Sequence, residues 1–283
     1  MTLSPGEAES VRFLVLLPDK GETCLRKVNM DIKALLSDLQ NFYTLAYRGL
    51  LGIVRRPFYF KDAMIQMDYA GAGSLVIVFI VDLFVGMALS LQLSAELSSL
   101  GMKMYIGMIV GISVVRELGP VVTALVFTGR VGAGMASELG SMVLGHQVDT
   151  IRVFGFDPVK KLVVPRIVSS LIMLPALTVI GVAVSLLGGY YIAVFVSHQS
   201  GTFYWSSIRN ILTMENVLAG AIKPFIFGYL ISSICCYMGL STKGGAVGLR
   251  QSTTMAVVMS IVMIIISDFL LTRVLLYVLG FSV

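Results

Sequence analysis

The sequence predicts an all-α polytopic membrane protein, and its composition, segment pattern and charge distribution all support this fold class. Of its 283 residues, 57% are hydrophobic and only 13% are charged, with a mean hydropathy of +0.89. Such a composition lies far outside the range of soluble domains. Five long apolar segments follow one another, and lysines and arginines gather in alternate connections. We therefore expect an N-terminal interfacial amphipathic helix, five transmembrane helices and a short cytoplasmic helix between the second and third.

We expect a short extension, residues 1–30, and a membrane domain, residues 31–283, whose first part is residues 31–60. Residues 1–30 have no clear periodicity, and we expect a short cytoplasmic extension without a cleavable signal peptide. In residues 31–60, apolar side chains recur at three- and four-residue spacing with polar side chains opposite. This pattern predicts an amphipathic helix in the membrane interface, and packing on a soluble partner is the alternative.

Five apolar segments are each long enough to cross a bilayer, which takes roughly 20 residues. The third is too long for a simple crossing and contains prolines, so we expect it to begin in the interface, tilt or break. Lys223 and Pro224, near the start of the fourth, are interpreted as an interfacial charge and a kink. The predicted spans are residues 74–94, 104–128, 163–196, 218–240 and 253–279.

The distribution of basic residues predicts the orientation of the spans. Lysine and arginine are abundant before the first span, between the second and third, and between the fourth and fifth. The other connections hold only Lys103 and Arg209, which predicts a cytoplasmic N-terminus and an external C-terminus. Phe203, Tyr204 and Trp205 in the outer connection suit an aromatic belt. The positive charge is a topology signal, so no nucleic-acid role is expected, and the sparse cysteines and histidines predict neither a disulfide framework nor a metal site.

An arginine and a glutamate, Arg116 and Glu117, lie side by side in the second apolar segment. Adjacent helical residues point about 100° apart, so each needs its own partner or access to water. Pro120 cannot donate a hydrogen bond to the carbonyl of Arg116, which predicts a locally open helix at the charges. Ionised groups at this depth cost roughly 3 kcal/mol each on insertion scales. A cavity wall or subunit seam and a purely structural pairing remain equally open.

The segment that follows, residues 129–142, is rich in Gly, Ala and Ser and is interpreted as too polar and small-sided for a further span. It opens a connection, residues 130–158, that is longer than structureless connections usually are. A short helix there could fit a groove in a cytoplasmic protein, and a plain connection is the alternative. The sequence has no phosphate-binding Gly-x-x-x-x-Gly-Lys-Ser/Thr loop, nucleophile elbow or His-Glu-x-x-His helix, which argues against an intramembrane hydrolase.

Several separated motifs resemble the signature of MlaE-type permeases, the membrane subunits of ABC transporters that work with MCE-domain proteins. The similarity covers about residues 35–280 and keeps the order and spacing of the motifs. They are the runs at residues 116–125, 129–132 and 136–142, then Gln147 with Asp149, the turn at 156–158, Pro165-Arg166, Leu174-Pro175, Gly188-Gly189 and the turn at 241–254.

The resemblance implies a non-catalytic permease subunit, a homodimer in the bacterial inner membrane that moves phospholipid between inner and outer membranes. It implies two cytoplasmic ABC ATPase subunits, which bind the ATP, and a periplasmic MCE-protein hexamer, with no cofactor in this chain. The residues expected to line or flank a lipid cavity between protomers are Arg116, Glu117, Leu118, Leu89 and Gln92. Those expected in a coupling helix against the ATPase are Ala136, Ser137, Glu138, Leu139, Gly140, Met142 and Gln147.

Two other functions stay open at this point. The chain could be an ion- or proton-coupled secondary transporter with Glu117 as the coupling carboxylate. It could also be a membrane scaffold that anchors partners through residues 130–158.

Overall fold

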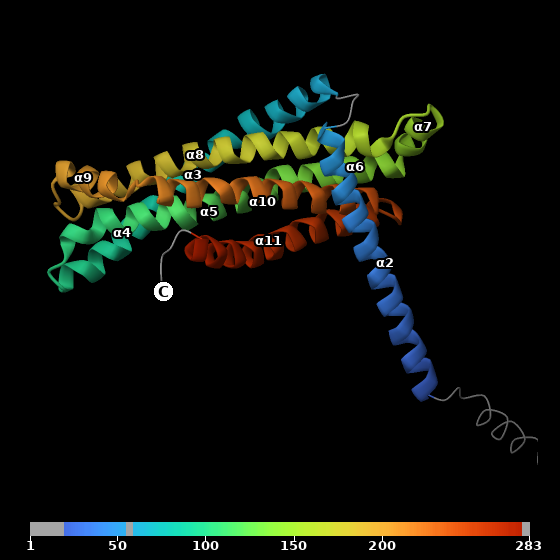
Figure 1. Cartoon of the computed structure of the whole chain (residues 1–283), viewed down its shortest axis with the longest axis horizontal. Coiled ribbons are helices and arrows are strands. Elements are labelled where there is room, and N and C mark those ends of the chain that lie inside the picture. The colour runs from blue at the N-terminus through green and yellow to red at the C-terminus, as the bar shows by residue number, and fades with distance from the viewer. Residues whose placement is uncertain (1–19, 55–58, 279–283) are drawn as a thin grey trace, which may run out of the picture. The chain divides into compact units, whose positions relative to one another are not determined.

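The computed structural model describes residues 20–54 and 59–278, and the regular structure in these ranges is entirely helical. The chain divides into two units, Met1–Thr44 and Leu45–Val283, with the boundary inside the first described helix. The elements are α2 (Lys20–Val54), α3 (Phe60–Ser99), η1 (Lys103–Tyr105), α4 (Ile106–Ser113), η2 (Val114–Leu118), α5 (Gly119–Phe127), η3 (Thr128–Gly132), α6 (Ala133–Leu144), α7 (Gln147–Val153), η4 (Val159–Val163), α8 (Val164–Phe195), α9 (Gly201–Ile211), α10 (Met214–Leu240) and α11 (Gly245–Val278). In Figure 1 the long helices of the second unit run side by side, with α7 at one end and α9 at the other.

The predicted membrane-protein class and its five spans are confirmed. Five helical stretches among the described residues are long and apolar enough to cross a bilayer: Phe60–Ser99, Lys103–Leu144, Val159–Phe195, Met214–Leu240 and Gly245–Tyr277. Each overlaps one predicted span. The third stretch does not break at Pro175, because α8 continues through it to Phe195.

The helix of the second span continues past its predicted end at residue 128, so residues 129–142 are part of this helix and not a separate short helix. The helix runs on through η3 and α6 to Leu144. Its small residues allow close packing: a Cβ added at Gly132 would lie 3.0 Å from Cys235 Sγ, and one at Gly140 2.8 Å from Thr242 Oγ1. Because this part of the helix packs against α10 and α11, it needs few large apolar side chains.

A seam of small residues joins α3 to α8. Every fourth residue of α3 from Ala70 to Ser94 is buried, and five of these seven side chains are small: Ala70, Ser74, Val78, Asp82, Gly86, Ser90 and Ser94. Ser90 Oγ donates to the carbonyl of Gly189 at 3.0 Å, and a Cβ at Gly86 would collide with the carbonyl of Ser185. Small residues at four-residue spacing let helix backbones approach closely where lipid gives no hydrophobic drive for association.

The predicted amphipathic helix is present with different bounds. Residues 31–54 are helical, but α2 already begins at Lys20, so the last part of the predicted extension is helical, while residues 1–19 lie outside the described residues. Within the first unit, Leu36, Leu39 and Tyr43 are exposed, and contact with the membrane interface stays a prediction. Within the second unit, the end of α2 packs on the start of α8, where Gly49 faces Ile167.

The connection between the third and fourth spans contains α9, and its aromatic residues do not all form a belt. Tyr204 is fully buried, and its hydroxyl donates to the carbonyl of Leu186 at 3.1 Å. Burial raises the pKa of the Tyr204 phenol. Phe203 and Trp205 are exposed, as a belt requires. Tyr204 is therefore a core residue that fixes α9 to α8.

Candidate functional site

An ionic cluster lies between three of the membrane-spanning helices. Lys223 Nζ on α10 forms an ion pair with Glu117 Oε2 on η2, and lies 2.7 Å from Asp268 Oδ1 on α11. It also donates to Thr272 Oγ1 at 2.8 Å, and the Thr272 hydroxyl lies 3.2 Å from Glu117 Oε1. We call Glu117, Lys223, Asp268 and Thr272 the ionic cluster. It joins the second, fourth and fifth spans through polar contacts.

The backbone around the cluster departs from regular α-helix where the sequence removes hydrogen bonds. Val114–Leu118 is π-helical and carries Arg116 and Glu117, which confirms the predicted opening before Pro120. π-helical turns inside α-helices are frequent at functional sites. On α10, Gly220 packs against the carbonyl of Val115, which only a residue without a Cβ could approach so closely. This contact brings Lys223 within reach of Glu117.

The interpretation of Lys223 as an interfacial charge is wrong. Its side chain is only 1% exposed, and α10 begins at Met214, nine residues earlier. At a rise of 1.5 Å per residue, Lys223 lies about 14 Å from that end of the helix, well inside an apolar core about 30 Å thick. Hydropathy placed the fourth span too late because the polar residues Glu215 and Asn216 begin it.

Asp268 and Thr272 are functional candidates that sequence reasoning missed. Asp268 is the only acidic residue in the described part of α11, and Thr272 follows it by one helical turn. An isolated carboxylate in one span and an isolated lysine in another are a signal of pairing, because unpaired ions at this depth are costly.

The cluster is most accessible at its carboxylates. Lys223 is buried, while the side chains of Glu117 and Asp268 are 37% and 21% exposed. Arg116, next to Glu117, is partly buried. Together these side chains supply two positive and two negative charges. A site of this kind can bind a group that itself carries both signs.

An apolar groove of about 380 Å³ lies between the second, third and fourth spans, two of which also carry the ionic cluster. Its walls are apolar apart from Thr178, and one proline from each of the three spans contributes to them. Val115 and Pro224 line it, and they are the chain neighbours of Arg116 and Lys223. The lining residues are Val115, Pro120, Pro175, Ala176, Thr178, Val179, Val182, Leu212, Val217, Gly220, Ala221, Pro224 and Phe225.

The structure does not gather all five residues predicted to line a lipid cavity. Glu117 belongs to the ionic cluster, and Arg116 and Leu118 flank it in η2. Leu89 packs against the apolar cluster that contains Val114 and Val115. Gln92 is exposed on α3. The cavity role of these five residues stays a prediction.

The residues predicted to couple to an ATPase divide into a buried and an exposed group. Ala136, Leu139 and Gly140 are buried in the packing of α6, and Ser137 and Met142 are partly buried. Glu138 and Gln147 are exposed, and Glu138 Oε2 pairs with the buried Arg166 at 2.7 Å.

The most exposed apolar residues of this connection lie further along the chain, at the end of α7 and just after it. Val153, Phe154 and Phe156 are 85%, 72% and 50% exposed, and we call them the apolar tip. Glycine supplies the turn between the two phenylalanines, since Gly155 has φ of +82°. All three lie in the predicted connection, residues 130–158. The sequence pattern that could have identified this exposed turn is a glycine with a phenylalanine on each side, followed by the polar residue Asp157.

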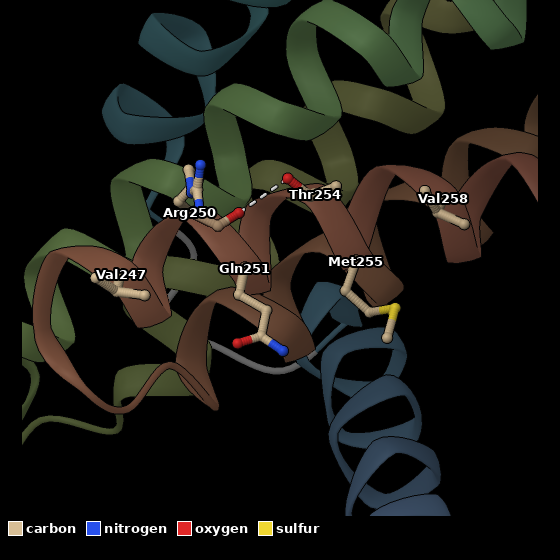
Figure 2. A pocket seen from close by; sticks show the side chains of 6 residues that line it. All are labelled: Val247, Arg250, Gln251, Thr254, Met255 and Val258. Atoms are coloured by element: carbon tan, nitrogen blue, oxygen red, sulfur yellow. Dashed lines mark hydrogen bonds between the residues drawn. The ribbon is translucent and has the colours of Figure 1, made fainter.

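One face of α11 is largely open. Figure 2 shows six side chains projecting from this helix around a hollow of about 460 Å³: Val247, Arg250, Gln251, Thr254, Met255 and Val258. Further along α11, Val262, Ile266 and Phe269 are also exposed. The fifth span therefore contacts the bundle with one side and presents an apolar face on the other.

Five spans that enclose an ionic cluster and an apolar groove define a polytopic membrane protein with polar groups of the kind that mark substrate pathways. The chain matches the family Permease MlaE over residues 63–274, and it belongs to that family.

Curated relatives agree with this membership. A probable ABC transporter permease protein of Rickettsia typhi is 35% identical over 83% of this chain and 90% of its own length. A probable ABC transporter permease protein of a Synechocystis strain is 37% identical over 75% of this chain and 81% of its own length. The intermembrane phospholipid transport system permease protein MlaE of Haemophilus influenzae is 31% identical over 81% of this chain and 88% of its own length.

Proposed function

We propose that this chain is the permease subunit of an ABC transporter that moves phospholipid between the inner and outer membranes of a bacterium. The observation that carries the proposal is that the same two spans, the second and the fourth, line an apolar groove and carry the charged groups of Glu117 and Lys223. A phospholipid needs both surfaces at once: an apolar wall for its acyl chains and charges for its headgroup. The Haemophilus influenzae relative, named for intermembrane phospholipid transport, supports the same cargo.

The headgroup would meet the exposed side of the cluster. Glu117 and Asp268 would accept hydrogen bonds from an ammonium group, and the guanidinium of Arg116, with its five N–H donors, would bind the phosphate. Lys223 would hold the two carboxylates in place from behind. The alternative of an ion-coupled carrier gains no support here, because the carboxylate of Glu117 is already paired with Lys223.

Three surfaces of the chain each suit one of the three expected protein partners. The open face of α11 suits a second copy of the chain, since a span with an apolar face could pack there against its symmetry mate. The apolar tip suits a groove in a cytoplasmic ABC ATPase, and the α9 end suits a periplasmic MCE protein. This assignment puts the N-terminus in the cytoplasm and the C-terminus in the periplasm, as the basic residues predict.

Lipid bound to the purified protein tests the cargo. The substitution Val179→Trp places an indole at the rim of the groove, where Val179 is 70% exposed. We expect mass spectrometry to find several-fold less co-purified phospholipid than in the unaltered protein. Val76→Trp is the matched control, because Val76 on α3 is 62% exposed and does not line the groove. Equal loss of lipid in both variants would argue against the groove as the lipid site.

An ATP hydrolysis assay tests whether this chain is a non-catalytic subunit. The purified chain should hydrolyse no ATP, and activity should appear only when an ABC ATPase co-purifies with it. Turnover by the chain alone would refute the assignment as a non-catalytic subunit.

A further inference from the structure

A further carboxylate within the spans lies outside the ionic cluster. Asp82 is at the centre of the small-residue seam on α3, and its side chain is 1% exposed. The neighbouring residues on its own seam are Val78 and Gly86, neither of which carries a polar side chain.

The contacts of the Asp82 carboxyl group are few. Thr123 Oγ1 on α5 donates to Oδ2 at 3.2 Å, while Oδ1 is buried and has no hydrogen-bond partner in the structure. The hydroxyl of Ser185 on α8 donates to the backbone carbonyl of Asp82 at 2.7 Å, so it is used elsewhere. Space for the carboxyl group exists because residue 181 is glycine. A Cβ at this position would collide with Asp82 Oδ2.

The charged groups on the elements around Asp82 have other partners or lie near the ends of helices. Neither α4 nor α5 contains a titratable residue. On α8, Arg166 pairs with Glu138. On η3, Arg130 donates to Ser74 Oγ at 2.9 Å, two helical turns from Asp82 along α3. The remaining titratable groups on α3, η1 and α8 are Lys61, Asp62, Asp68, Tyr69, Glu96, Lys103, Tyr105, Tyr190 and Tyr191.

No ion pair joins Asp82 to a basic side chain among the described residues. A carboxylate in this setting has one neutral donor on one oxygen and none on the other. Burying such an ion is far costlier than burying the neutral acid, so the group takes up a proton instead. A metal cation would need several more oxygen ligands than the carboxyl and one hydroxyl available.

We propose that Asp82 is a proton-binding site at the α3–α8 seam. The carboxyl group holds one proton while α3, α5 and α8 are packed together, and the neutral acid is what allows the seam to close. Release of the proton requires water to reach Oδ1, which requires α3 to separate from α8. Proton binding at Asp82 and closure of the seam are therefore one coupled event, in which no residue of the ionic cluster takes part.

Infrared spectroscopy of the full chain at pH 7, in micelles of an alkyl maltoside detergent that contains no carbonyl group, tests the proposal. A protonated carboxyl group gives a carbonyl stretching band that a carboxylate lacks. We expect this acid band in the unaltered protein and its loss in Asp82→Asn, which keeps the shape of the side chain. Asp268→Asn is the matched control: Asp268 is ion-paired with Lys223, so this variant should lose carboxylate absorption and keep the acid band. An acid band that is missing from the unaltered protein, or that survives Asp82→Asn, overturns the proposal.

A second variant decides the question if Asp82→Asn does not fold. Thr123→Val removes the hydroxyl that contacts Oδ2 and leaves the carboxyl group in place. The acid band should then move to higher frequency, because the carbonyl loses a hydrogen bond. An acid band that does not move in this variant would place the protonated group elsewhere and overturn the proposal.

Discussion

Replacing Lys223 by methionine should cause a large loss of stability. The side chains have similar length and apolar character, so the substitution removes the ammonium group while largely filling its space. It leaves the carboxylates of Glu117 and Asp268 facing each other without the cation that separates them. Removing one partner of a buried ion pair costs about 3–5 kcal/mol.

The structure favours the lower end of this range. Glu117 is 37% exposed, so solvent can stabilise part of its charge, while Asp268 is 21% exposed and has less such access. We expect a loss of about 3 kcal/mol, which is roughly a hundredfold change in the folding equilibrium. Equilibrium unfolding in detergent micelles, followed by circular dichroism, measures it. Lys243→Met is the matched control, because Lys243 is exposed in the turn before α11 and should change stability little.

A neutral triple variant separates charge from packing. If the loss in Lys223→Met comes from unpaired carboxylates, adding Glu117→Gln and Asp268→Asn should recover stability. If it comes from a badly packed methionine, the triple variant should be no more stable than the single one. That second result, or a Lys223→Met protein as stable as the unaltered chain, would refute the account of the cluster as a charge-balanced network.

Two further predictions concern packing at the seam and at α9. Gly86→Ala should destabilise the protein by about 1–3 kcal/mol, because the added methyl group collides with the carbonyl of Ser185; Gly129→Ala, where the methyl group meets open space, should have no such effect in the same unfolding assay. Tyr204→Phe should cost about 1 kcal/mol by leaving the carbonyl of Leu186 without its donor, seen as a lower thermal midpoint, and an unchanged midpoint would show that this bond contributes nothing.

Sequence alone predicts well what depends on local composition. Five apolar segments yield five helical spans, because in lipid the backbone N–H and C=O groups of each segment must bond to one another. Pro120 predicts the opened helix at Arg116 and Glu117, because a missing N–H has a local consequence. The same reasoning fails for residues 129–142, where small polar side chains look unlike a span until the helices that pack against them are known.

Pairings across the sequence cannot be predicted in this way. Lys223 is separated from Glu117 by 106 residues and from Asp268 by 45. A single sequence does not show which spans pack against one another in the fold. The coupling prediction has the same limit. Ala136, Leu139 and Gly140 look available for a partner, yet they are buried because α10 and α11 pack over α6.

The spans are held together in two different ways, and the difference bears on which of them can move. The α3–α8 seam is closed by small residues and hydroxyls along its whole length, so separating these helices would break many contacts at once. By contrast, α11 presents much of its surface outward and is fixed in its C-terminal third by Asp268 and Thr272. A headgroup that competed for Lys223 would weaken this connection directly. Lipid binding at the cluster and displacement of the fifth span should therefore occur together, without separation of α3 from α8.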